Sequence, residues 1–154
     1  MTLTTKSNLL RSAGFISLIL ALFQAVISFS PAWSLYFGAP PELTENPPLL
    51  IISGLIVSII FIIFGLYGLS GSGDIKPLPF LRSGLIIVGS IYLLRGMLIV
   101  LQVLIILDLV HIDEEITPQL VLSSLVSLLI GIIYVTGTIK NWQGLKPLSI
   151  NKTN

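Results

Sequence analysis

The sequence has no cysteine and a single histidine, His111. The absence of cysteine excludes disulfides, thiol nucleophiles and thiolate metal sites. A lone histidine excludes paired-histidine metal motifs and leaves little acid–base chemistry for catalysis. An enzyme is therefore the least favoured functional class, and we expect no cofactor.

Charge is also scarce. Only 10% of the 154 residues are charged, whereas soluble domains carry about 25%. Hydrophobic residues make up 54% of the chain, and the mean hydropathy is +1.01. The expected partner is therefore a lipid bilayer. The length allows one domain, residues 1–154, without a separate soluble catalytic module. The net charge of +1 is too small to suggest nucleic acid as a partner.

Four apolar runs are long enough to cross a bilayer, which takes about 20 helical residues. They cover residues 12–30, 49–69, 83–107 and 119–139. The sequence therefore predicts an all-α, integral membrane four-helix bundle. Thr117 followed by Pro118 is typical of an N-cap and first helical residue, so we expect the fourth helix to begin there.

The first run also resembles a secretory signal peptide. Lys6 and Arg11 precede it, and small residues near Ser30 mimic a cleavage site. However, Pro31 would be the first residue after cleavage, which disfavours processing, and the run is long for a signal. We therefore interpret it as a retained span.

Positive charge is absent from two of the loops. Residues 31–48 and 108–118 contain no Lys or Arg and carry acidic residues instead. Seven cations lie in the N-terminal segment, the middle loop or the C-terminal segment: Lys6, Arg11, Lys76, Arg82, Lys140, Lys146 and Lys152. Because short loops rich in Lys and Arg stay cytoplasmic, we expect both termini inside and the two acidic loops outside.

Two short matches suggest that the chain contains two tandem helical hairpins. Leu-Arg-Ser precedes a glycine in the segments around Arg11 and Arg82, and Val57-Ser58 is matched by Val126-Ser127. The separations of the two pairs are nearly equal, as expected for a parallel repeat. Apolar sequence of low complexity also produces such matches by chance.

Arg95, the eighth cation, lies near the middle of the third run. A cation there costs about 3 kcal/mol on insertion scales, so it needs a partner, a water-filled pocket or a function. Counting from the flanking cations places Gln24, Ser58 and Ser127 at a similar depth. Gln102 follows Arg95 by seven residues and lies on nearly the same helix face. These five residues are the candidate ligand-binding set.

Arg95 has a structural and a functional interpretation. In the first, it bonds to glutamine, serine and backbone groups and fixes the packing of its helix. In the second, it binds an anionic lipid, a small anion or an acidic partner. The four runs contain no Asp or Glu, so no internal carboxylate is available to pair with it. Intramembrane ionisable residues are functional by default.

The second acidic loop holds weak candidates for a metal site, namely His111, Asp108 and Asp113, with Glu114 and Glu115 beside them. Carboxylates suit Ca²⁺ or Mg²⁺, and histidine suits a transition metal. Acidic residues also collect in an outer loop simply because cations are excluded from it. We therefore expect no bound metal.

The segments FGLYGLSG (64–71), LR (81–82) and IYLLRG (91–96) resemble small uncharacterised four-span bacterial inner-membrane proteins. The resemblance covers the second and third runs, roughly a third of the chain. It implies a bacterial cytoplasmic membrane and supplies no activity.

Three functional hypotheses follow. Rows of small residues at helical spacing allow close helix packing in lipid. The leading hypothesis is therefore a structural or accessory subunit that forms a homo-oligomer or packs with a larger membrane partner. The second is a protein that binds or transports an anionic lipid or small anion through Arg95. The third, a membrane enzyme, has the least support.

Overall fold

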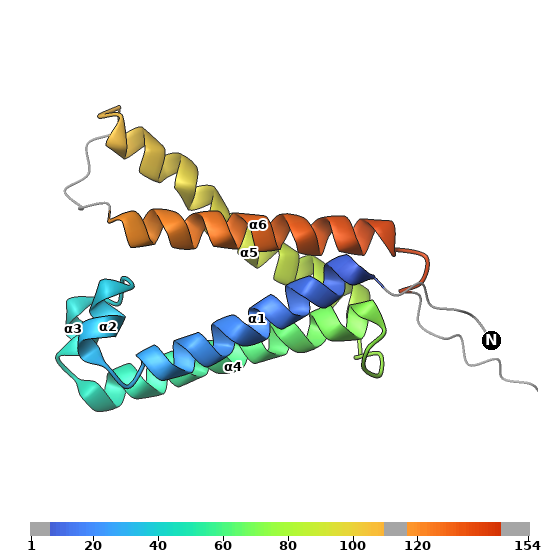
Figure 1. Cartoon of the computed structure of the whole chain (residues 1–154), viewed down its shortest axis with the longest axis horizontal. Helices are drawn as coiled ribbons and strands as arrows, with labels where there is room; N and C mark the ends of the chain where they lie inside the picture. The colour runs from blue at the N-terminus through green and yellow to red at the C-terminus, as the bar shows by residue number, and fades with distance from the viewer. Residues whose placement is uncertain (1–6, 110–116, 146–154) are drawn as a thin grey trace, which may run out of the picture.

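The computed structural model describes residues 7–109 and 117–145. This part of the chain is helical and contains no strand. The helices are α1 (Asn8–Ile27), α2 (Pro31–Tyr36), α3 (Pro41–Thr44), α4 (Pro47–Ser72), α5 (Leu81–Ile106) and α6 (Pro118–Lys140). Four of them, α1, α4, α5 and α6, are long and apolar enough to cross a membrane. The prediction of an all-α four-helix membrane bundle is confirmed (Figure 1).

The helix ends follow from local sequence. The first long helix ends at Ile27, three residues earlier than expected, because Pro31 begins α2 with Ser30 as its N-cap. The second extends past residue 69 to Ser72, where Gly73 adopts φ +82°. Glycine takes this left-handed conformation without the steric cost that other residues meet. Helix α6 begins at Pro118, as predicted.

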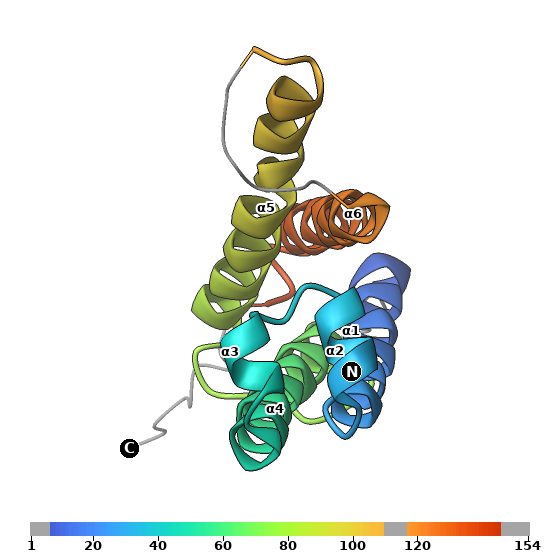
Figure 2. The same cartoon turned by 90° about the vertical axis from the view of Figure 1, so that its left-hand side faces the viewer.

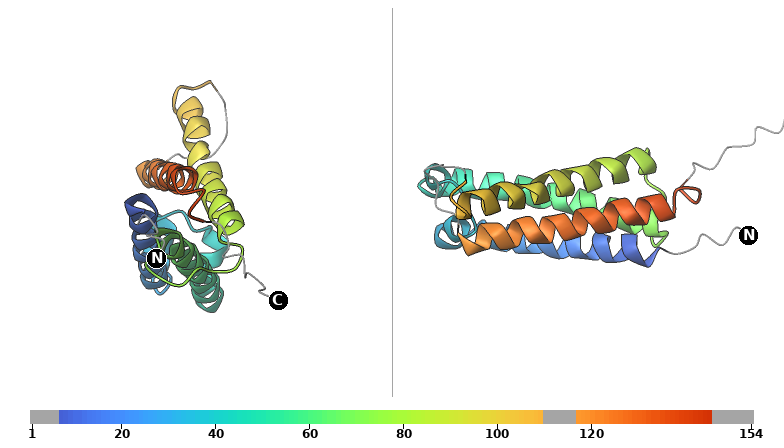
Figure 3. Two further views of the ribbon diagram at one scale, coloured as in Figure 1. Left: turned by 90° about the vertical axis from the view of Figure 1, so that its right-hand side faces the viewer. Right: turned by 90° about the horizontal axis from the view of Figure 1, so that it is seen from above.

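The four long helices form two hairpins, one of α1 and α4 and the other of α5 and α6. Figure 1 shows that the hairpins diverge from the end where α1 begins toward the end where α2 and α3 lie. In Figures 2 and 3, the C-terminal end of α5 stands away from the other three long helices. The bundle is thus closed at one end and opens between the hairpins at the other.

Glycines let the helix backbones approach closely. A Cβ atom on Gly68 of α4 would lie 2.7 Å from the Cα atom of Gly14 on α1. A Cβ atom on Gly96 of α5 would lie 2.4 Å from the Cα atom of Leu128 on α6. Lipid gives little hydrophobic drive between helices, so such close contacts carry much of the packing energy.

A chain of hydroxyl groups joins all four long helices at the centre of the bundle. The Tyr92 hydroxyl of α5 donates to Ser17 Oγ of α1 at 3.0 Å. Ser17 Oγ lies 3.2 Å from the Tyr134 hydroxyl of α6. That hydroxyl donates to the Phe64 carbonyl oxygen of α4 at 2.7 Å. Because Tyr134 donates to Phe64, it must accept from Ser17, so the direction of every bond in the chain is fixed.

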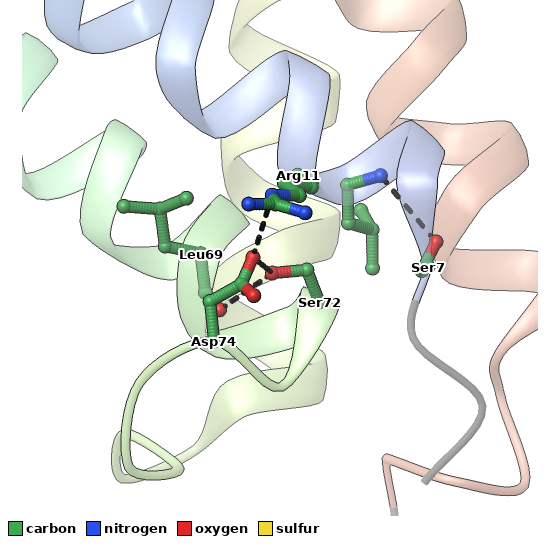
Figure 4. A network of polar contacts seen from close by, with 6 residues as sticks. Ser7, Arg11, Leu69, Ser72 and Asp74 are labelled. Atoms are coloured by element: carbon green, nitrogen blue, oxygen red, sulfur yellow. Dashed lines mark hydrogen bonds and ion pairs between the residues drawn. The ribbon is translucent and has the colours of Figure 1, made fainter.

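The closed end carries an ion pair between the first helix and the middle loop. Arg11 Nε lies 3.3 Å from Asp74 Oδ2, and Ser72 Oγ donates to the same carboxylate oxygen at 2.8 Å. Figure 4 shows Arg11 extending from α1 toward Asp74, just after the end of α4. A second cation, Arg82, lies over the Trp142 ring at 4.6 Å from its centroid. Cationic and aromatic groups therefore collect at this end of the molecule.

Candidate functional site: a pocket between the two hairpins

A pocket of about 460 Å³ lies between the hairpins, in the half of the bundle that carries α2 and α3. All four long helices contribute to its walls. Its volume falls within the range of about 300–1,000 Å³ that is typical of small-ligand sites. The divergence of the hairpins therefore creates space of a size that a ligand can fill.

Among the described residues that line this pocket, Arg95 is the one cation, and none is Asp or Glu. The guanidinium Nη2 lies 3.5 Å from Ser123 Oγ on α6, and the Arg95 side chain is exposed. The pocket wall therefore carries a positive charge that no carboxylate among the described lining residues balances.

The serine hydroxyls of the pocket are already committed to the backbone of their own segment. Five serines that line the pocket each donate to a backbone carbonyl at 2.6–3.0 Å: Ser28 to Gln24, Ser34 to Ile27, Ser53 to Leu50, Ser123 to Leu120 and Ser127 to Ser123. A hydroxyl has only one proton to donate, but its oxygen can still accept. A ligand would therefore find few serine protons available.

The remaining donors are Arg95 and the amides of two glutamines, Gln24 on α1 and Gln119 on α6. Arginine offers five N–H donors and no acceptor. The Gln119 Oε1 atom is buried and has no hydrogen-bond partner among the described residues. Buried polar atoms are rarely left unpaired, so this oxygen is expected to have a partner that the described residues do not supply. Gln119 had not been singled out from the sequence, because it stands at the edge of an apolar run.

The structure brings together three of the five candidate residues. Gln24, Arg95 and Ser127 all line the pocket. Ser58 lies instead in the contact between α1 and α4, where its hydroxyl donates to the Ala21 carbonyl at 2.8 Å. Gln102 is also outside the pocket, and its Oε1 atom is buried without a partner among the described residues. The shared depth inferred from sequence did not reveal which helix faces meet.

The inner end of the pocket is aromatic. Phe61 and Tyr92 both line it, and their rings stack with centroids 6.2 Å apart. Tyr92 also stacks on Tyr134, at 5.8 Å. Neither tyrosine was among the candidate residues of the sequence analysis. The hydroxyl chain through Ser17 was missed, although a tyrosine in the middle of an apolar run is a signal for such a bond.

The segment with α2 and α3 lies at the other end of the pocket. Phe37, Gly38 and Pro40 of this segment are among the lining residues. Gly38 has φ +91°, and a Cβ atom there would lie 2.8 Å from Leu120 Cδ2 on α6. The segment thus reaches from the first hairpin to the second across the pocket.

Of the weak metal candidates, only Asp108 lies in the described part of the chain. His111 and Asp113, with Glu114 and Glu115, lie outside it. Within residues 7–109 and 117–145, no cluster of side chains is suited to hold a metal ion.

Comparison with known proteins does not add a family to this description. No family model matches the chain, and no curated protein or solved structure shows significant similarity to it.

Proposed function

We propose that this multi-pass membrane protein binds an anionic ligand in the pocket between its hairpins, with Arg95 as the cation that holds the acidic group. The observation that carries the proposal is the positive charge of Arg95 in a pocket whose described lining residues include no carboxylate. Planar guanidinium groups bind carboxylate and phosphate oxygens with two parallel hydrogen bonds. A cationic ligand would be repelled by Arg95.

The expected topology supports an outer location for this pocket. Lys and Arg cluster at the closed end of the bundle, including Arg11, Arg82 and Lys140, whereas the α2–α3 segment has acidic residues and no cation. By the positive-inside rule, both termini are cytoplasmic and the pocket lies in the outer half of the membrane. A bacterial cytoplasmic membrane is the location implied by the resemblance in the second and third spans.

A structural or accessory subunit remains the alternative. Rows of small residues motivated that hypothesis, and they are largely used within the chain. Gly14, Gly68 and Gly96, for example, are buried in contacts between the protein's own helices. The pocket therefore supports ligand binding better than these rows support a homo-oligomer or a larger membrane partner.

The proposal is tested by native mass spectrometry of the protein released from lipid nanodiscs that formed without detergent. We expect an anionic molecule on the wild-type chain and its loss from Arg95→Leu. Lys140→Gln is the matched control, because it also removes one cation but lies outside the pocket. Equal retention by Arg95→Leu and the wild type would refute the proposal. A wild-type chain with no bound anion would refute it as well.

A further inference from the structure

The two sides of the pocket differ in chemistry. The walls from α5 and α6 carry its charge, on Arg95, and the polar side chains of Gln119 and Ser123. The facing wall from α4 is largely apolar, with Leu50, Val57 and Phe61. A small inorganic anion would satisfy the first side and leave the second uncovered. A ligand that matches both needs an acidic group and an extended apolar part.

The apolar wall of α4 is long. Leu50 and Phe61, at its two ends, are eleven residues apart on α4, which corresponds to about 16 Å along the helix. Because bond angles reduce the advance per C–C bond from about 1.5 Å to about 1.3 Å, an extended hydrocarbon chain of twelve carbons, about 14 Å long, covers most of this distance. The stacked rings of Phe61 and Tyr92 mark the inner end of this wall.

The volume limits the number of chains. At about 460 Å³, the pocket is in the lower half of the range for small-ligand sites, about 300–1,000 Å³. Two acyl chains with a glycerol headgroup exceed this space, whereas one chain with an acidic head fits it.

We infer that the ligand is a single-chain acidic amphiphile, whose carboxylate or phosphate group binds Arg95 beside Ser123 and whose chain lies against the apolar wall of α4. This inference rests on the proposed function and specifies its ligand. Gln119 lies on the same side of the pocket as the acidic group.

The test compares five probes on the protein in nanodiscs of a zwitterionic two-chain lipid: dodecanoate, dodecyl phosphate, dodecanol, inorganic phosphate and a two-chain phosphatidic acid. Retention is counted by native mass spectrometry. We expect one dodecanoate or dodecyl phosphate per chain and no retained dodecanol. The better retained of the two acids identifies the headgroup as carboxylate or phosphate. Each CH₂ group added to the ligand's chain should raise its affinity about fourfold, with the affinity referred to the ligand free in water. The reason is that burial of one CH₂ group is worth about 0.8 kcal/mol.

Two pocket variants and one control variant locate the binding. Arg95→Gln should abolish retention of both single-chain acids, and Lys140→Gln should leave it unchanged. Val57→Phe fills the apolar side and leaves the cation in place, so it should reduce binding of dodecanoate at least tenfold. Circular dichroism and size-exclusion chromatography show whether each variant is folded.

Three outcomes would overturn the inference. If inorganic phosphate binds through Arg95 and an attached hydrocarbon chain adds no affinity, the pocket is an anion site alone. The proposed function would then stand. Preference for the two-chain phosphatidic acid would also leave the proposed function standing. If no anion is retained in a way that depends on Arg95, both this inference and the proposed function are overturned.

Discussion

The Tyr134 hydroxyl donates a 2.7 Å hydrogen bond to the Phe64 carbonyl oxygen, seventy positions earlier in the chain. This bond joins the second hairpin to the first. The hydroxyl lies beside Gly68, and a Cβ atom on Gly68 would be only 2.8 Å from it. The absence of a side chain at Gly68 therefore makes room for this bond. The junction of the hairpins thus depends on a tyrosine on one helix and a glycine on another.

Tyr134→Phe should lower the free energy of unfolding by about 1–2 kcal/mol. Hydrogen bonds between membrane helices are worth about 0.6 kcal/mol on average and up to about 1.7 kcal/mol, and this hydroxyl makes two. Tyr67→Phe is the control, because the Tyr67 hydroxyl makes one exposed 3.3 Å bond to Pro79. Reversible unfolding in mixed micelles measures both. Equal stability of the two variants would show that the hydroxyl chain does not stabilise the bundle.

Gly68→Ala should destabilise the protein by about 1–3 kcal/mol, the usual cost of overpacking. The new Cβ atom would lie 2.7 Å from the Gly14 Cα atom, so the backbones of α1 and α4 must separate. This cost exceeds the gain in helix propensity, which is at most about 1 kcal/mol. Gly144→Ala is the control, since its nearest neighbour would be 3.6 Å away. An unfolding temperature of Gly68→Ala at or above that of the wild type would contradict the close packing.

Arg95→Leu should leave the stability of the bundle unchanged or raise it. The described residues offer Arg95 one hydrogen bond, the 3.5 Å contact with Ser123. A cation within the membrane costs about 3 kcal/mol on insertion scales, and leucine removes this cost. Thermal unfolding in nanodiscs, after removal of any bound ligand, measures the change. A loss of more than about 1 kcal/mol would favour the purely structural interpretation of Arg95.

Single cysteines can determine the orientation without background, because the native chain has none. Glu45 before α4 and Ile75 after α4 are both exposed. With the positive-inside orientation, a membrane-impermeant maleimide should label Glu45→Cys in intact cells and label Ile75→Cys only after the cells are opened. The reverse pattern would invert the topology and place the pocket in the inner half of the membrane.

The spans and the isolation of Arg95 were predictable from the chain alone. Four long apolar runs require helices, because a backbone in lipid must satisfy its hydrogen bonds internally. The two hairpins were suggested by the short matches around Arg11 and Arg82 and at Val57 and Val126. Loop length would not have given them, because the shortest connection between long helices, residues 73–80, joins α4 to α5, which belong to different hairpins. The absence of Asp and Glu from the spans likewise showed that Arg95 has no carboxylate partner there.

Only the tertiary structure decided which polar residues share a pocket. Residue counting gave Ser58 and Ser127 similar depths, since helical rise converts sequence separation into distance along the membrane normal. Yet Ser127 lines the pocket and Ser58 is buried between α1 and α4. The direction that each helix face takes depends on close contacts such as that of Gly14 with Gly68. Those contacts join residues far apart in sequence. The sequence therefore determined the depth of each polar residue along its helix, whereas the packing of the helices determined which way the residue faces.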